Sequence, residues 1–124
     1  MLIIDNGVIT YKLKRLEVIG AFGKSPSAQI SNLKAVTKDT NPWTMKVLRG
    51  IRAPGTGFPY VIMLGTMRHR KGKDFCVVYK RNPVFILEFE GEKFKRWVIP
   101  ANAANQEALE KLHGWQIGGS GGSQ

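Results

Sequence analysis

Alternating apolar and polar positions dominate the chain and predict β-strands. Ile9, Tyr11 and Leu13 alternate with polar residues, which is typical of a half-buried strand. Further along, apolar segments recur about every ten residues with turn residues between them, as in antiparallel sandwiches and barrels. These segments cover residues 60–67, 75–79, 84–89 and 94–99. We therefore expect a mostly β domain.

Three segments carry weaker signals. Residues 45–49 predict a further short strand, and residues 16–18 continue the first strand or pair with it. Residues 53–59 contain four Gly and Pro residues in seven, so we expect an irregular loop there. We interpret residues 50–57 as a crossover between two sheets.

One helix is expected near the C-terminus. Asn102 suits the N-cap position, and an apolar stripe at helical spacing follows it, formed by Ala104, Ala108, Leu109 and Leu112. Gly114 is a natural residue to end the helix. A helix this short is marginal alone, so it must pack on the sheet. We assign residues 1–115 to one domain and the Gly/Ser-rich residues 116–124 to a flexible tail with the composition of an added linker.

The composition limits the class of protein. Its 124 residues are 43% hydrophobic and 23% charged, as in a single globular domain. The long uncharged stretches contain Pro and Gly and are too short for a transmembrane helix. Cys76 is the one cysteine, so no disulfide forms within the chain, and its apolar neighbours predict a buried thiol. Without a signal peptide pattern, we expect a cytoplasmic location, with peripheral membrane association as an option, or a domain cut from a longer protein.

Charge is the feature that points to a partner. Nineteen Lys and Arg against nine Asp and Glu give a net charge of +10, which favours anionic partners. The densest group surrounds one predicted hairpin turn and consists of Arg68, His69, Arg70, Lys71 and Lys73. Like charges repel, so local stability does not explain them, whereas converging cationic donors suit a phosphate. We add Lys80 and Arg81 to this candidate site, and expect them near Lys93, Lys95 and Arg96 at neighbouring strand ends.

The order of elements resembles the bacterial pleckstrin-homology-like domain family, in which a small barrel of strands is closed by a C-terminal helix. The resemblance spans residues 5–113 and lies in three places: Gly20-Ala21-Phe22-Gly23 followed by Ile30; Arg49-Gly50-Ile51-Arg52 with Gly57-Phe58-Pro59 and Leu64-Gly65-Thr66-Met67; and residues 75–79, 84–87 and 94–100 with the closing helix. It implies a barrel of about seven antiparallel strands. It also implies a binding or assembly module, sometimes oligomeric, without catalytic residues.

These observations favour a non-enzymatic binding or scaffold module whose basic surface meets an anionic membrane or a phosphorylated ligand. One alternative is a nucleic-acid-binding protein in which Trp43, Phe58, Tyr60 and Trp97 stack on bases. Another is a purely structural assembly domain, forming homo-oligomers or binding a protein partner through the edge of strand 84–89 or through the helix stripe and Trp115. No phosphate-loop fingerprint, metal-ligand pattern or catalytic triad is present, so we expect no cofactor and no enzyme activity.

Overall fold

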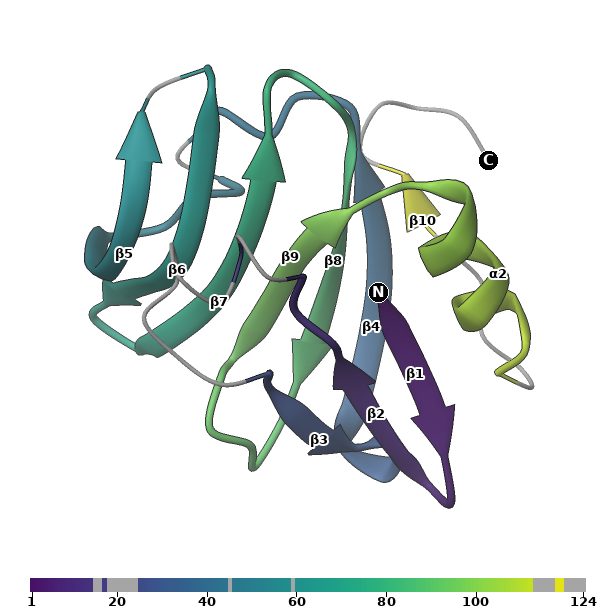
Figure 1. The fold of residues 1–124 in the computed structure, drawn as a ribbon. Coiled ribbons are helices and arrows are strands. Elements are labelled where there is room, and N and C mark those ends of the chain that lie inside the picture. The colour runs from purple at the N-terminus through teal and green to yellow at the C-terminus, as the bar shows by residue number, and fades with distance from the viewer. Residues whose placement is uncertain (15–16, 18–24, 45, 59, 113–117, 120–124) are drawn as a thin grey trace.

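The computed structural model describes residues 1–14, 17, 25–44, 46–58, 60–112 and 118–119. Its described strands form two sheets (Figure 1). The small sheet has the order β1-β2-β3 and consists of β1 (Leu2–Asp5), β2 (Val8–Tyr11) and β3 (Ser27–Gln29). The large sheet has the order β10-β4-β8-β9-β7-β6-β5. Its strands are β4 (Leu33–Asp39), β5 (Ile51–Phe58), β6 (Ile62–His69), β7 (Gly72–Tyr79), β8 (Val84–Phe89), β9 (Arg96–Pro100) and β10 (Gly118–Gly119).

The prediction of a mostly β domain with one C-terminal helix is confirmed. A short 3₁₀ helix, η1 (Ile30–Asn32), precedes β4, and the α-helix α2 (Ala103–Glu110) follows β9. The described strands do not close into a barrel, because the small sheet remains separate from the large one. Figure 1 shows the small sheet lying across the β4, β8 and β9 half of the large sheet. Gly118–Gly119, from the segment predicted to be a tail, pair with β4.

The large sheet is not purely antiparallel. After β7 the chain turns through residues 80–83 and returns as β8, leaving a gap of one strand, which β9 then fills. Consequently β9 pairs antiparallel with β8 but parallel with β7, with Asp74 opposite Arg96 and Cys76 opposite Val98. The start of β9 therefore lies beside the start of β7, which decides where the residues before β9 are placed.

The predicted loop at residues 53–59, the crossover between the sheets and the open edge of strand 84–89 are wrong. Of residues 53–59, expected to be an irregular loop, residues 53–58 belong to β5, and residue 59 lies outside the described part of the chain. Strand β5 pairs with β6 in the same sheet, so residues 51–57 do not cross between the two sheets. Pro54 is tolerated because β5 is an edge strand and its register shifts between Arg52 and Gly55. Strand β8 is internal, between β4 and β9, so its edge is not open to a partner.

The predicted strand at residues 45–49 is also wrong for its described part. Residues 46–48 form a turn instead, in which the amides of Val47 and Leu48 both donate to the carbonyl of Thr44. Val47 is fully buried, so burial rather than strand pairing explains its apolar side chain. Within residues 16–18 the structure describes Glu17 alone, which is helical rather than extended.

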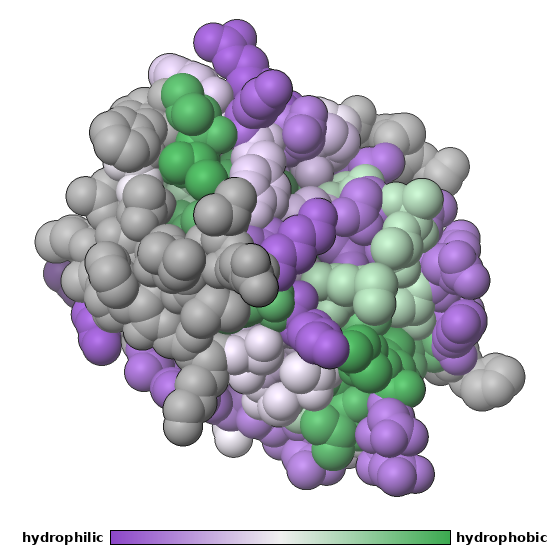
Figure 2. Space-filling view, in the orientation of Figure 1, coloured by the Kyte–Doolittle hydropathy of each residue, from purple (hydrophilic) through white to green (hydrophobic). Residues whose placement is uncertain are grey.

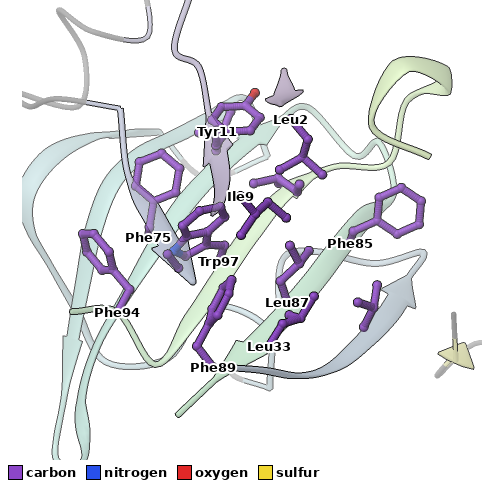
Figure 3. Close-up of a cluster of buried hydrophobic side chains, with 14 of the residues drawn as sticks. Leu2, Ile9, Tyr11, Leu33, Phe75, Phe85, Leu87, Phe89, Phe94 and Trp97 are labelled. Carbon is purple, nitrogen blue, oxygen red and sulfur yellow. The ribbon is translucent and has the colours of Figure 1, made fainter. Parts of the chain in front are cut away.

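Two apolar clusters cover the two faces of the large sheet. The front cluster lies between the two sheets, where Ile9 and Tyr11 of β2 meet Trp97, Phe75 and Phe89 of the large sheet (Figure 3). The rings of Phe89 and Trp97 are 4.8 Å apart, and Phe94 packs on Phe75 at 5.7 Å. The back cluster lies beneath the β4–β5 connection and contains Val47, Met67, Cys76, Val78, Val84, Ile86 and Val98. Because strand side chains alternate, β7 contributes Phe75 and Val77 to one face and Cys76 and Val78 to the other.

Helix α2 begins as predicted and packs against the small sheet. The Asn102 side chain accepts a hydrogen bond from the Asn105 amide, which is the expected N-cap. Asn105 is fully buried. Its side chain accepts a hydrogen bond from the Leu2 amide and donates one to the Pro100 carbonyl, so it connects α2 to β1 and β9. Leu109 is buried in the front cluster. The predicted helix end at Gly114 and the possible docking residue Trp115 lie outside the described residues.

Cys76 is expected to be unreactive in the folded protein. Its side chain is 0% exposed, and burial raises the pKa of its thiol far above 9.0. The thiolate is the reactive species, so we predict negligible labelling by a maleimide at neutral pH and stoichiometric labelling in concentrated urea. Rapid labelling of the native protein, measured by mass spectrometry, would contradict the buried position of this strand.

Candidate functional site

The basic hairpin between β6 and β7 is anchored from behind by a buried carboxylate. Asp74 is 0% exposed and accepts two hydrogen bonds of 2.8 Å from Arg49, in a bidentate arrangement. The Nε of Arg96 lies 3.6 Å from the same carboxylate, while its Nη2 donates to the carbonyls of Lys46 and Val47. These contacts fix the β4–β5 connection to the back of the sheet, with two residue pairs between Asp74 and the hairpin turn.

Gly50 allows this connection to approach the hairpin closely. A Cβ atom at Gly50 would lie 1.9 Å from the carbonyl oxygen of Arg68, and the backbone φ of +83° also favours glycine. The close approach of Gly50 to β6 therefore places Arg49 next to this strand. The contact explains why a glycine follows the arginine that holds Asp74.

His69 belongs to this buried network rather than to the basic surface. Its side chain is 10% exposed, and its Nε2 lies 3.0 Å from Asp74 Oδ1. The Lys71 amide donates to His69 Nδ1, so the tautomer with hydrogen on Nε2 lets that atom donate to Asp74. The imidazole thus joins the hairpin turn to Asp74 and is directed away from a ligand in solution.

A group of lysines and arginines, which we name the hairpin end, gathers at the β6–β7 turn. It consists of Arg68, Arg70, Lys71 and Lys73 from the hairpin, and Lys93 and Lys95 from the β8–β9 loop. The ammonium groups of Lys73 and Lys93 lie 5.3 and 5.6 Å from the ring centroid of Phe94. Because Phe94 packs into the front cluster, both lysines are positioned by the core (Figure 3).

Lys95 joins the hairpin end through the parallel pairing of β9 with β7. The Lys95 amide donates to the Lys73 carbonyl at 2.8 Å. Its side chain lies over Gly72, where an added Cβ would be 3.1 Å from Lys95 Cγ. The two turns therefore form one continuous basic surface, although they are about twenty residues apart in sequence.

The positive charge of the hairpin end is poorly compensated. Partial burial, and then the neighbouring charges of Lys93 and Arg68, lower the pKa of Lys73 below its usual 10.5. Nearby acids face other partners: Asp74 faces the back, and Glu92 accepts hydrogen bonds from Gln29 and Asn32. Within the described part of the chain, no ion pair involves Arg70, Lys71, Lys73, Lys93 or Lys95.

The structure separates the basic residues that the sequence grouped together. Lys80 and Arg81 follow the far end of β7, whose eight residues span about 25 Å at 3.3 Å per residue. They therefore lie at the opposite end of the sheet from Arg70 and Lys71. Lys93 and Lys95, expected beside Lys80 and Arg81, instead lie beside Lys73. The parallel strand β9 causes this exchange, and nothing in the local sequence signals it.

The aromatic residues proposed as a stacking surface are also divided. Trp97 is 1% exposed in the front cluster and cannot reach a nucleobase. Trp43 and Tyr60 lie together, with ring centroids 5.7 Å apart, near Arg81 rather than near the hairpin end. The side chain of Phe58 lies outside the described part of the structure. The predicted basic and aromatic groove is therefore not formed from these four residues.

A separate cavity of about 550 Å³ contains polar groups that sequence reasoning missed. Buried Glu17 accepts hydrogen bonds there from the Lys14 amide and from the Tyr79 hydroxyl. Burial, followed by the effect of Glu17, raises the pKa of both Tyr11 and Tyr79 well above 10. A buried carboxylate disfavours anions, so this cavity does not extend the basic site. An isolated glutamate carries no sequence signal for such a position.

Comparison of the chain with protein-family models, curated proteins and solved structures found no match. Among the described residues, no helix is long and apolar enough to cross a membrane. The same residues include no cluster of three or more His, Cys, Asp or Glu side chains that would suit a metal ion.

Replacing Asp74 with asparagine is expected to destabilise the fold strongly. The change leaves two guanidinium groups without their buried counter-charge, and breaking such a pair costs about 3–5 kcal/mol. Urea unfolding at pH 7 measures the loss. The control is Glu90→Gln, which removes an exposed pair with Lys34 at 4.0 Å and should cost under about 1 kcal/mol.

The pH dependence gives a second test of the same group. Burial opposes ionisation of Asp74, but hydrogen bonds from Arg49 and His69 outweigh it and lower its pKa below 3.8. The stabilisation is therefore complete above that pH and is lost as the pH falls through the folded-state pKa. The difference in unfolding free energy between wild type and Asp74→Asn should stay constant from neutral pH downward and narrow only below about pH 4. A difference that disappears near neutrality would contradict this account.

Proposed function

We propose that the protein is a non-enzymatic binding module whose hairpin end takes a partner bearing several phosphate groups. The observation that carries the proposal is the convergence of six basic residues, from two distant turns, with no acidic partner among the described residues for five of them. Several Lys and Arg donors directed at one place suit phosphate oxygens. The shared chemistry is that of a phosphorylated small molecule or a lipid headgroup.

The arrangement of the hairpin end supports binding rather than incidental surface charge. Mutual repulsion of Lys73, Lys93 and Arg68 is unfavourable in the free protein, and a bound anion would relieve it. The Phe94 ring lies near the ammonium groups of Lys73 and Lys93, and the Lys95 stem lies over Gly72. Such contacts restrict the side chains, which lowers the entropy lost when a ligand binds. The resemblance of the sequence to bacterial pleckstrin-homology-like domains agrees with a binding module.

The chemistry at the same surface supports the proposal of a non-enzymatic role. Lysine and arginine supply charge and hydrogen-bond donors, but catalysis by proton transfer needs a group that titrates near neutral pH. His69 is the histidine that adjoins this surface, and its Nε2 is engaged with Asp74. We therefore assign recognition of the anion, and no reaction, to the hairpin end.

The test is binding of inositol hexakisphosphate, used as a soluble polyphosphate probe, by calorimetry over a salt series. We expect affinity to fall as salt rises, because exposed charges are screened. The double charge reversal Arg70→Glu/Lys71→Glu should weaken binding at least about tenfold, since charge-assisted hydrogen bonds are worth roughly 1.5–3 kcal/mol each. Both side chains are exposed, so the unfolding midpoint should stay near that of the wild type.

A matched control separates the site from net charge. Lys12→Glu/Lys111→Glu changes the net charge equally at exposed positions outside the hairpin end and should retain affinity within about twofold. Equal losses in both variants would reduce the proposal to non-specific attraction. Tighter binding of a single-stranded oligonucleotide, with a salt slope of about −0.7 per phosphate contacted, would favour nucleic acid instead.

A further inference from the structure

The end of the sheet opposite the hairpin end carries a different kind of surface. Here the β5–β6 turn and the β7–β8 turn are joined, because the Lys80 amide donates to the Val61 carbonyl at 2.8 Å. Trp43, from the β4–β5 connection, donates its indole N–H to the Lys80 carbonyl at 2.5 Å. We name the group formed by Trp43, Tyr60, Val61, Lys80 and Arg81 the turn end.

Two adjacent apolar side chains are exposed at the turn end. Tyr60 is 55% exposed and Val61 is 58% exposed. Among the large hydrophobic residues that the structure describes as exposed, these two are adjacent in the sequence. In Figure 2 a small green patch lies beside purple atoms at the top of the view, where Figure 1 places the tips of β5 and β6 and the β7–β8 turn. Two exposed apolar neighbours alone are common on protein surfaces, so the case for a partner depends on the backbone, contacts and charge around them.

The backbone at Tyr60 is strained for the residue that it carries. Tyr60 has a φ of +63°, a region that glycine or asparagine adopts far more readily than an aromatic residue. A turn selected only for folding would favour one of those residues. Strained positions that persist are concentrated at functional sites, so the presence of tyrosine here points to a use for its ring.

The contacts of the Tyr60 ring discriminate between partners. The guanidinium carbon of Arg81 lies 4.8 Å from the ring centroid, and the Trp43 ring packs against Tyr60 at 5.7 Å. A nucleobase stacking on Tyr60 would compete with these neighbours. A bilayer interface requires no such displacement, because Tyr and Trp rings are favoured at headgroup level with their polar atoms hydrated. The exposed Val61 has no role in nucleic-acid recognition but suits the acyl boundary.

Charge around the turn end complements an anionic lipid surface. The segments that form it, residues 41–44, 58–61 and 79–83, contain Lys80 and Arg81 and no Asp or Glu. Glu17 accepts a hydrogen bond from the Tyr79 hydroxyl but is itself buried. Asp39, the acidic residue that precedes the first of these segments, is buried, and its carboxylate accepts a hydrogen bond from the Asn41 amide. Basic residues near an anionic leaflet gain electrostatic attraction, while apolar neighbours that enter the interface add burial.

We propose that the turn end is a membrane-facing surface that docks on anionic bilayers. Tyr60 and Val61 enter the boundary between headgroups and acyl chains, and Lys80 and Arg81 contact lipid phosphates. If the tips of the β5–β6 and β7–β8 turns enter the bilayer with β7 upright, the hairpin end lies about 25 Å away from the membrane contact. The proposal therefore assigns lipid to the turn end and leaves the hairpin end open to a soluble phosphorylated partner. It does not rest on ligand binding at the hairpin end.

The first experiment is co-sedimentation with phosphatidylglycerol-containing vesicles and with vesicles of phosphatidylcholine alone. The variant Tyr60→Asn/Val61→Ser should reduce binding to the anionic vesicles at least about tenfold, because apolar burial is lost. Asparagine tolerates a positive φ, which offsets part of the lost ring contacts with Trp43 and Arg81, so the unfolding midpoint of this variant should stay near that of the wild type. Lys80→Asn/Arg81→Gln should weaken the binding most at low salt. Ile3→Ser, which changes an exposed apolar residue of β1, is the control and should bind as the wild type.

A labelling experiment locates the membrane directly. Buried Cys76 leaves a new surface cysteine as the reactive thiol, so Val61→Cys and Lys71→Cys can each carry an environment-sensitive dye. Anionic vesicles should shift the emission of the dye at position 61 to shorter wavelength and leave the dye at position 71 unchanged. A shift at position 71 alone would overturn the proposal.

The two functional proposals fail in different ways. Vesicle binding that survives Tyr60→Asn/Val61→Ser but is lost in Arg70→Glu/Lys71→Glu would place lipid at the hairpin end and refute the turn end. Absence of vesicle binding by the wild type would also refute it, while binding of inositol hexakisphosphate would remain a separate result. If the turn-end variant loses vesicles but keeps inositol hexakisphosphate, both assignments stand.

Discussion

The carboxylate of Asp74 is the buried charge around which the back of the large sheet is organised. It is paired with Arg49 from the β4–β5 connection, faces Arg96 across the parallel β7–β9 pair, and contacts His69 at the end of β6. A fully buried carboxylate is unfavourable unless charges and hydrogen bonds surround it. Because Asp74 needs these partners, the β4–β5 connection, β6, β7 and β9 come together around it. The hairpin turn therefore lies beside the end of the β8–β9 loop.

The burial of Asp74 also separates the acidic and basic side chains of β7, which lie on opposite faces of the sheet. Asp74 is directed to the back, whereas its neighbours Lys73 and Phe75 are directed toward the front of the sheet, where Phe94 links them. The carboxylate of Asp74 is thus paired with arginines on the back, whereas the lysines and arginines of the hairpin remain at the surface. An exposed carboxylate beside the basic turn would weaken its attraction for anions. Here the carboxylate of the hairpin, Asp74, is buried and paired with arginines instead.

The two ends of β7 therefore offer two distinct surfaces. The hairpin end is polar and densely positive, which suits phosphate groups. The turn end combines exposed tyrosine and valine with two basic residues, which suits an interface between water and lipid. A module with one such surface at each end has the geometry to hold a phosphorylated partner near a membrane. In the arrangement that we propose, the length of the buried strand β7 sets the distance between the two surfaces.

The sequence by itself determined the elements whose cause is local. Period-two apolar positions predicted β2, and apolar runs between turn residues predicted β7 and β8. The basic turn predicted the β6–β7 hairpin and Asn102 the start of α2, because pattern, turn and cap act within a few residues. Tertiary structure alone decided the rest. The return of β9 between β7 and β8 moved Lys93 and Lys95 to Lys73 and left Lys80 and Arg81 at the far end, where they meet Trp43 and Tyr60. Such pairings depend on which distant strands exclude water from each other, and no local pattern along the chain encodes that choice.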